Sequence, residues 1–437
     1  MSYAGYITKL KNVEKHPNAD RLKIATVFGN KVIIGLDMEE GDMVIYFPTD
    51  GQLSIEFCEA NDLIRRKDPV TGEAIGGYLD ENKRHIRTMR LRGEISDGLI
   101  CGIDSLSTFT NISKLQTGDV VDVLDGTEIC RKYVPVKKIR EPQNFNGNKN
   151  QKEKTIKFPN FHEHIDTKQL MYNLGQLEVG DICYITLKMH GTSGRTGFQE
   201  RVERRYKKGL KKILAKILRK KEYTESRYWD YATGTRRVVL ENYEGGFYGS
   251  NDFRQKYHRQ FVDKLHRGET AYYEIVGFQD GGRPIMGTVS NKKIGDKEFV
   301  KRYGDTTTYH YGCEDGESDI YIYRMSTTNT EGIEIDYPWD LVQLRAEQMG
   351  IKVTMELDRF IYTTEEDLLE RINKYADGVD PVGKTHIREG AVLRIEGKEK
   401  FKALKHKNDS FKQLEGIIKD AGILDMEEAE DLIETDN

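Results

Sequence analysis

Short apolar or alternating runs, separated by turn residues, dominate the first 135 residues of the chain. The turns between them contain pairs such as Gly29-Asn30 and Asp50-Gly51. Brief alternating runs bounded by glycine, asparagine and aspartate are typical of β-strands. Because the strands follow one another closely and few helical patterns intervene, residues 1–135 are predicted to form a small closed β-barrel. The predicted strands begin at Tyr6, Lys23, Lys31 and Met43.

The pattern changes after residue 135. Residues 136–154 are polar and irregular, which predicts an interdomain linker. From residue 155, strand-like runs mix with segments whose apolar residues recur every three or four positions, the spacing of a helix. This mixture predicts an α+β domain over residues 155–412, followed by an acidic helix and tail over 413–437. The predicted strands begin at Asp181, Thr270, Asp319 and Ala391, and the predicted helices span 252–266, 338–349 and 364–375.

The formal net charge, 68 − 72 = −4, conceals a strong segregation of charge. Residues 201–221 hold eleven lysines or arginines against one glutamate, a local charge of +10. Residues 425–437 hold seven acids and no base, a local charge of −7. The near-neutral total therefore does not exclude a face that binds a polyanion.

Several protein classes are disfavoured by features that the sequence lacks. Its apolar runs are far shorter than the roughly 20 residues of a membrane helix, and Met1 to Ile7 show no secretory signal. The five cysteines are scattered and form no C-x-x-C pair, so neither a disulfide framework nor a structural zinc cluster is expected. We expect a monomer that is cytoplasmic, in its own cell or in an infected host, with no membrane partner.

Lys188 leaves the predicted strand that begins at Asp181, and small residues follow it in the run KMHGTSG. A nucleophilic lysine must lose its proton, which burial and neighbouring cations favour. Gly191, three residues later, permits a close approach of the backbone. Because K-x-x-G is common by chance, residues elsewhere in the chain must support this interpretation.

Three further features that could belong to the same site follow Lys188 along the chain. Glu274 lies within the apolar strand run YEIVG, and Glu389 opens a similar run, EGAVLR. Lys405 and Lys407 are two residues apart, which places them on one face of a strand. Each feature alone is more typical of a structural or solvated position. Together, in this order, they predict a functional set.

The four features resemble motifs I, III, IV and V of the covalent nucleotidyltransferases, which include RNA ligases, DNA ligases and mRNA-capping guanylyltransferases. The run KMHGTSG at 188–194 resembles motif I of RNA ligases, and LKHKNDSF at 404–411 closely resembles their motif V. His190 stands where most relatives carry aspartate, although some RNA ligases have histidine there. Whether His190 helps to hold a metal's water shell, as the acid would, stays open.

The N-terminal part is similar to the OB module that precedes the catalytic domain in one RNA ligase family. The similar runs are HPNADRL at 16–22, GDMVIYF at 41–47 and RTMRLRGEISDG at 87–98. DNA ligases and capping enzymes carry their OB domain after motif V, where this chain has about 25 residues. Domain order therefore favours RNA ligase. The resemblance implies an OB-type β-barrel followed by a nucleotidyltransferase domain of antiparallel sheets with flanking helices.

The resemblance also implies an activity, the ATP-dependent sealing of a 3′-OH to a 5′-phosphate in RNA. Lys188 would attack the α-phosphate of ATP and form lysyl–AMP. The adenylate would pass to the 5′-phosphate end, and the 3′-OH would then displace AMP. The implied cofactors are ATP and Mg²⁺ or Mn²⁺, and the implied partner is RNA or an RNA-containing duplex, such as a nick with an RNA 3′-OH strand.

Motif positions assign the nucleotide contacts. Lys405 and Lys407 would contact the α-phosphate, and Glu389 would bind the metal directly or through its waters. Glu274 would accept a hydrogen bond from the ribose hydroxyl. Gly191 would border the nucleotide.

Two assignments have alternatives. The motif Ia arginine is best matched by Arg236, with Arg237 as the alternative. The ring that stacks on adenine is assigned to Tyr321, with Tyr323 and its neighbours as alternatives. Packing within a strand explains these tyrosines nearly as well.

An insertion at about residues 200–232 separates Lys188 from Arg236. It contains an apolar stripe at helical spacing with lysines on the other face. The favoured interpretation is a basic helix that clamps the RNA phosphate backbone through four lysines, and a solvated helix docked on the domain follows closely. A membrane-surface helix is the third alternative. The stripe consists of Leu210, Ile213, Leu214, Ile217 and Leu218, and the lysines are Lys207, Lys208, Lys211 and Lys212.

Rival functions remain at this stage. A polynucleotide ligase that also seals DNA is the nearest alternative, and a capping guanylyltransferase comes next. A non-catalytic tRNA- or RNA-binding OB protein with a degenerate partner domain belongs to a different class. The complete set of lysines and glutamates argues against such degeneration.

Overall fold

A computed structural model provides the structure of the chain and describes residues 3–67, 71–72, 74–135, 154–240 and 252–420. The predicted linker at 136–154 lies outside these residues except for Lys154, and the acidic segment 425–437 lies outside them entirely. The chain divides into two compact units, which are described separately below. Of the described residues, those up to 135, 289–307 and 407–420 form the first unit, and those in 154–288 and 308–406 form the second.

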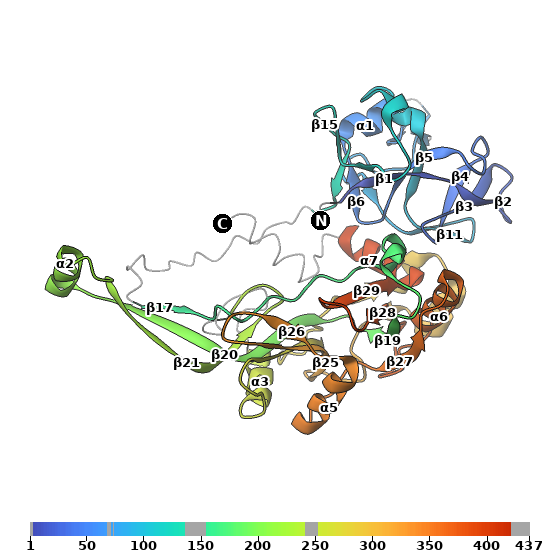
Figure 1. Ribbon diagram of the computed structural model, residues 1–437. Coiled ribbons are helices and arrows are strands. Elements are labelled where there is room, and N and C mark those ends of the chain that lie inside the picture. The colour runs from blue at the N-terminus through green and yellow to red at the C-terminus, as the bar shows by residue number, and fades with distance from the viewer. Residues whose placement is uncertain (1–2, 68–70, 73, 136–153, 241–251, 421–437) are drawn as a thin grey trace. The chain divides into compact units, whose positions relative to one another are not determined.

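Short antiparallel strands build the N-terminal part of the first unit, as the alternating sequence pattern predicts (Figure 1). Its four-stranded sheet has the order β12-β5-β1-β13, and its two three-stranded sheets have the orders β2-β3-β4 and β16-β6-β9. Ile7, Ile45 and Phe47 lie at the centre of its apolar core. The elements are β1 (Gly5–Lys9), β2 (Lys11–Lys15), β3 (Leu22–Val27), β4 (Asn30–Gly35), β5 (Met43–Phe47), β6 (Gly51–Leu53), α1 (Ile55–Ala60), β7 (Arg65–Lys67), β8 (Ala74–Gly76), β9 (His85–Ile86), β10 (Met89–Leu91), β11 (Glu94–Ser96), β12 (Leu99–Gly102), η1 (Ile103–Leu106), η2 (Ile112–Lys114), β13 (Val120–Val121), β14 (Val123–Leu124), β15 (Thr127–Glu128) and β16 (Cys130–Lys132).

Two later segments of the chain belong to the same unit. Helix α7 contacts β23 and η5, so the two segments also pack on each other. This helix runs through position 412, where the sequence analysis placed the end of the second domain, because Phe411 and Leu414 are both buried on its inner face. The added elements are β23 (Val289–Ser290), η5 (Asn291–Ile294), α4 (Lys297–Tyr303), β24 (Thr306–Thr307) and α7 (Asp409–Asp420).

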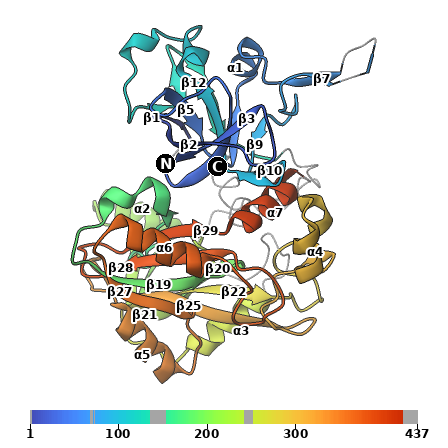
Figure 2. The ribbon, with the colours of Figure 1, turned by 90° about the vertical axis from the view of Figure 1, so that its right-hand side faces the viewer.

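Two mainly antiparallel sheets form the second unit. One has the order β17-β20-β22-β25-β26 with β21 paired to β20, and the other has the order β18-β29-β28-β19-β27. Helix α3 contacts β20 and α5 contacts β25 of the first sheet, while α6 contacts β19 and β28 of the second (Figure 2). The elements are β17 (Lys154–Lys157), β18 (Lys168–Gln169), η3 (Leu170–Tyr172), η4 (Leu174–Gln176), β19 (Ile182–Lys188), β20 (Thr192–Tyr206), α2 (Gly209–Ile217), β21 (Tyr223–Gly234), α3 (Asp252–Phe261), β22 (Glu269–Gly277), β25 (Ser318–Thr328), β26 (Glu334–Asp336), α5 (Trp339–Met349), β27 (Glu356–Ile361), α6 (Glu365–Ala376), β28 (Gly390–Ile395) and β29 (Lys402–Lys407).

The four strands and three helices predicted for this part are confirmed as β19, β22, β25, β28, α3, α5 and α6. Helix α3 ends at Phe261, five residues before the predicted end at 266, and Asp263 shortly after it has a left-handed backbone with φ +64°. None of the helices in the described part of the chain is long and apolar enough to span a membrane.

The predicted insertion forms a long β-hairpin with a helix at its tip (Figure 1). Strands β20 and β21 pair without interruption from Arg195 and Gly234 to Tyr206 and Tyr223. Helix α2 joins their ends, which confirms the predicted helix. The sequence pattern does not predict the two flanking strands, because their outer halves carry charged residues on both faces and lack an alternating pattern.

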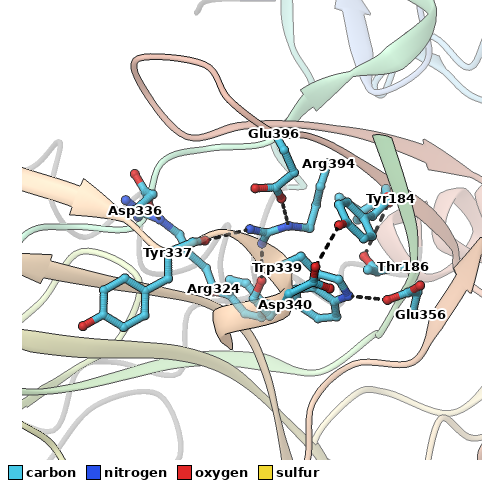
Figure 3. A network of polar contacts seen from close by, with 12 residues as sticks. Tyr184, Thr186, Arg324, Asp336, Tyr337, Trp339, Asp340, Glu356, Arg394 and Glu396 are labelled. Carbon is cyan, nitrogen blue, oxygen red and sulfur yellow. Dashed lines mark hydrogen bonds and ion pairs between the residues drawn. The ribbon is translucent and has the colours of Figure 1, made fainter. Parts of the chain in front are cut away.

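A network of polar contacts ties the two sheets of the second unit together (Figure 3). Arg394 of β28 donates to the carbonyl oxygen of Tyr323 in β25 at 2.8 Å and pairs with Glu396 at 3.3 Å. Its guanidinium also lies 5.0 Å from the centre of the Trp339 ring. The Trp339 indole donates to Glu356 at the start of β27 at 2.9 Å. These contacts hold β28, the strand that follows Glu389, against the sheet that carries Glu274.

Candidate active site

Strand pairing brings Lys188 and Glu389 together. Lys188 is the last residue of β19 and lies opposite Gly390, the first residue of β28. Glu389 directly precedes that strand, and its Oε1 lies 2.7 Å from Lys188 Nζ. The Lys188 side chain is 21% exposed, whereas that of Glu389 is 3% exposed. The predicted nucleophile is therefore accessible, with a buried carboxylate beside it.

The second oxygen of Glu389 faces His190. Oε2 lies 3.9 Å from His190 Nδ1, and no residue in the described part of the chain forms a hydrogen bond with it. A buried anionic oxygen is unfavourable unless a cation or water binds it. The described residues contain no group of three or more His, Cys, Asp or Glu that could hold a metal ion. The unpartnered oxygen of Glu389 is a hard donor of the kind that Mg²⁺ or Mn²⁺ accepts when phosphates and waters complete the shell, so this residue fits such an ion.

Two tyrosines that the sequence analysis missed support His190. The Tyr311 hydroxyl accepts a hydrogen bond from the His190 backbone N–H at 2.6 Å. The Tyr309 ring meets the imidazole edge-on, with ring centres 4.7 Å apart. Burial, with a smaller contribution from Glu389, raises the pKa of Tyr311 well above its usual range, so this phenol stays neutral. In the sequence, Gly312 after Tyr311 is the only signal of this turn, in which Tyr311 has a left-handed backbone with φ +51°.

Gly191 and Glu274 shape the loop that follows Lys188. A Cβ atom at position 191 would lie 2.2 Å from the Ile275 carbonyl oxygen, so the close approach of two strands requires glycine. The Gly191 N–H donates to Glu274 Oε1 at 3.0 Å, and Ser193 Oγ donates to Oε2 at 3.4 Å. The structure therefore places Glu274 against the nucleophile loop.

Strand register brings Tyr321 close to the Glu274 carboxylate. Tyr321 lies opposite Glu274 in the β22–β25 pairing. Tyr321 as a whole residue is 7% exposed, and Lys352 Nζ lies 5.6 Å from the centre of its ring. The alternative, Tyr323, contacts the His164 ring at 5.0 Å between ring centres. Register therefore places Tyr321 beside Glu274, and protein atoms cover most of its ring.

Arg236 and Arg237 lie just beyond the end of β21 and share one partner. Arg236 Nη1 lies 3.0 Å from Asp166 Oδ1, and Arg237 Nη2 lies 3.1 Å from Asp166 Oδ2. Buried Arg195, which the sequence analysis did not single out, donates to the Arg237 carbonyl oxygen at 2.8 Å. Asp166 and Arg195 therefore fix the turn that carries both candidate arginines. These contacts do not distinguish between the roles of Arg236 and Arg237.

Lys405 and Lys407 both lie on β29, which neighbours β28 in the five-stranded sheet. Lys405 lies opposite Gln169 in the parallel β18–β29 pairing. Lys407 Nζ lies 2.8 Å from both carboxylate oxygens of Glu415 in α7.

The four candidate RNA-binding lysines lie at the tip of the β20–β21 hairpin. Lys207 Nζ donates to the Lys221 carbonyl oxygen at 3.0 Å, and Lys212 lies 3.9 Å from Glu222. Lys208, Lys211 and Lys212 are exposed. Three apolar residues of the predicted stripe are exposed as well, at 56% for Ile213, 71% for Ile217 and 53% for Leu218.

Comparison with known proteins identifies the N-terminal module. Residues 5–103 match a family model described as an OB-fold domain. This match confirms the predicted OB-type barrel over those residues. No curated protein matches the sequence.

Solved structures of the RNA ligase of Naegleria gruberi share the fold of nearly the whole chain. A lysine-to-alanine mutant with ATP and Mn gives a TM-score of 0.55 at 16% identity, covering 94% of this chain and 98% of that chain. An apo aspartate-to-alanine mutant gives 0.56 at 17% identity, with coverage of 94% and 98%. The ligase with pyrophosphate gives 0.54 at 17% identity, with coverage of 94% and 97%. The predicted fold class, an OB-type β-barrel followed by an α+β domain of antiparallel sheets with flanking helices, is therefore confirmed.

Proposed function

We propose that this chain is an ATP-dependent RNA ligase that seals 3′-OH and 5′-phosphate ends through a lysyl–AMP intermediate. The observation that carries the proposal is the pairing of accessible Lys188 with buried Glu389 at the ends of neighbouring strands. The shared fold of the Naegleria gruberi RNA ligase, solved with ATP and Mn, supports it. The order of the motifs along the chain supports it as well.

The reaction would begin at Lys188. Its neutral amine attacks the α-phosphate of ATP in line with the leaving pyrophosphate, which forms a P–N bond and breaks a P–O bond. The adenylate passes to a 5′-phosphate end, and a 3′-OH displaces AMP to form the phosphodiester. Because such displacements need little covalent chemistry beyond the nucleophile, positioning and charge neutralisation supply most of the catalysis.

Charge explains why a divalent metal belongs here. Glu389 beside Lys188 favours the protonated ammonium, which is not nucleophilic. A bound Mg²⁺ or Mn²⁺ would neutralise the carboxylate and the phosphates. Glu389 would hold it through Oε2, and His190, whose Nδ1 lies 3.9 Å from that oxygen, would contact its water shell.

The remaining residues would bind the nucleotide. Lys405 and Lys407 would contact the α-phosphate as point charges. Glu274 would accept a hydrogen bond from the ribose hydroxyl while it braces Gly191. Tyr321 would meet the adenine ring, and Arg236 would contact the nucleotide from the turn after β21.

Labelled nucleotide tests the proposal. The purified chain, incubated with α-³²P-ATP and Mn²⁺, is expected to carry a covalent label that survives denaturation, and α-³²P-GTP should give none. Label from GTP instead would indicate a capping guanylyltransferase, and no label from either nucleotide would indicate a non-catalytic RNA-binding protein. A panel of nicked RNA, DNA and hybrid duplexes then separates an RNA ligase, which needs an RNA 3′-OH strand, from a ligase that also seals DNA.

We further propose that the hairpin tip clamps the RNA phosphate backbone. Its support is the group of exposed lysines on α2 and the turn before it. Changing Lys211 and Lys212 to glutamine should weaken RNA binding and reduce the slope of log Kd against log salt. The reduction should be up to about 0.9 for each lysine that neutralises a phosphate.

The matched control is Lys352→Gln with Lys374→Gln, which removes two exposed lysines from other surfaces of the second unit. Binding measured by fluorescence anisotropy from 50 to 300 mM salt should show the control slope unchanged. Equal slopes for both variants would contradict the clamp. Binding of α2 to anionic vesicles, with no effect of the lysines on RNA binding, would indicate a membrane-surface helix instead.

A further inference from the structure

The strand that carries the two candidate phosphate-binding lysines continues directly into a helix that is anchored in the first unit. Asn408 follows Lys407, and its Oδ1 accepts hydrogen bonds from the backbone N–H groups of Ser410 at 2.8 Å and Phe411 at 3.2 Å. These are the contacts of a helix N-cap. Lys407 is thus tied closely to the start of α7.

The second turn of α7 provides a carboxylate for Lys407. Both oxygens of Glu415 lie 2.8 Å from Lys407 Nζ, and the two side chains are 13% and 14% exposed. Burial by itself would raise the pKa of Glu415, but Lys407 and Lys419 outweigh burial and lower that pKa to about 2. Glu415 is therefore an anion at any physiological pH, and it fixes the direction of the Lys407 ammonium.

A second lysine competes for the same carboxylate. Lys419 lies one helical turn after Glu415, with its Nζ 3.7 Å from Glu415 Oε1. Lys419 Nζ lies closer, at 2.8 Å, to Asp50 Oδ2 between β5 and β6 of the OB module. The Lys419 side chain is 3% exposed, so it requires an anion nearby. Asp50 supplies that anion, so Glu415 can pair with Lys407.

The groups around Asp50 support the pairing of Lys419 with Asp50 and of Lys407 with Glu415. Burial would raise the pKa of Asp50, but Lys419, followed by His85, outweighs burial and keeps that pKa well below its usual value. His85 Nε2 lies 3.9 Å from Asp50, while His85 Nδ1 lies 2.8 Å from Asp420 at the end of α7. Asp420 also pairs with Arg87 at 2.8 Å. Two carboxylates therefore join the OB module to the end of α7. Asp50 of the OB module pairs with Lys419, and Asp420 of α7 pairs with His85 and Arg87.

We propose that Glu415 is a positioning residue for Lys407, and that Asp50 of the OB module protects this role by binding Lys419. The inference rests on the proposed contact of Lys407 with the α-phosphate. A lysine that must meet a phosphate gains from a fixed direction, because a misplacement of about 1 Å can slow a reaction about 100-fold. The OB module therefore contributes to the formation of lysyl–AMP, before any RNA is bound.

The chain offers a matched control on the same helix. Lys412 of α7 pairs with Asp97 of the OB module at 2.6 Å, and the two side chains are 13% and 5% exposed. This pair anchors α7 without a contact to Glu415 or Lys407 among the described interactions. A change there tests whether helix anchoring alone explains an effect.

The experiment measures the rate of lysyl–AMP formation in the full-length chain as a function of ATP concentration. Glu415→Gln is expected to lower the rate at saturating ATP between about 10- and 100-fold. Asp50→Asn should lower it several-fold, because Lys419 then competes for Glu415. Asp50→Asn combined with Lys419→Met should restore the rate to within about threefold of wild type, since the competitor is gone. Asp97→Asn should leave the rate within about twofold of wild type.

The outcomes separate this inference from the proposed function. If wild type forms no label, or if Lys407→Met labels normally, the proposed role of Lys407 fails. If Lys407→Met loses label while Glu415→Gln labels like wild type, the positioning role alone is overturned. A loss of rate in Asp97→Asn equal to that in Glu415→Gln would show helix anchoring instead of positioning. If Lys419→Met does not restore the rate of lysyl–AMP formation in the Asp50→Asn variant, the role of Asp50 is overturned. This comparison can be made even if Glu415→Gln does not fold.

Discussion

A Lys188→Arg variant is expected to lose covalent labelling by ATP at least about 1,000-fold, because a guanidinium keeps its proton and cannot attack phosphorus. Arginine preserves the cation beside Glu389, whose side chain is 3% exposed. Alanine would leave that buried carboxylate without its cation, which is destabilising in itself. The arginine variant therefore isolates the loss of the nucleophile from a loss of folding.

The expected defect is confined to the first step. Given a nicked RNA duplex that already carries AMP on its 5′-phosphate, Lys188→Arg should still form the phosphodiester, because that step uses the 3′-OH as its nucleophile. The control is Lys398→Arg, a lysine of the same unit that is 20% exposed and pairs with Asp181 at 2.7 Å, which should label normally. Label on the Lys188→Arg chain, or failure to seal the adenylated nick, would contradict the assigned role.

The candidate residues Lys188, Glu274 and Glu389 were named because of their order along the chain and their resemblance to family motifs. Each of them lies within, at the end of or directly before a strand with an apolar pattern. Their contacts were not predictable, because they depend on pairings between segments about 200 residues apart, such as Lys188 opposite Gly390. A one-residue change of register would have moved the carboxylate to the other face of the sheet.

Loop and ionic contacts gave a weaker sequence signal. Tyr311 supports His190 from an irregular segment without periodicity. Glu415 and Lys419 were expected to belong to an acidic helix and tail, where charged side chains are normally solvated. In the structure both side chains are largely buried, because each finds an opposite charge on or near α7. Charge pairing of this kind depends on tertiary contacts that the local sequence does not encode.

A Glu389→Gln variant is expected to lower the rate of lysyl–AMP formation at least about 100-fold at a fixed Mn²⁺ concentration. Glutamine keeps the size and one acceptor of the side chain but removes the negative charge that Oε2 would present to the metal. The sign of the effect is informative. Without a metal role, removing the anion 2.7 Å from Lys188 would favour the neutral amine and speed the attack.

Metal titration separates the two roles of the carboxylate. The Mn²⁺ concentration for half-maximal labelling should rise for Glu389→Gln, since one ligand is weakened, and high Mn²⁺ should recover part of the rate. Glu274→Gln is the matched control, because Glu274 contacts Gly191 and Ser193 at the same site but is not assigned to the metal. Its Mn²⁺ requirement should equal that of wild type, while its preference for ATP over 2′-deoxy-ATP should fall. A Glu389→Gln chain that labels as fast as wild type, with the same Mn²⁺ requirement, would remove Glu389 from the proposed metal site.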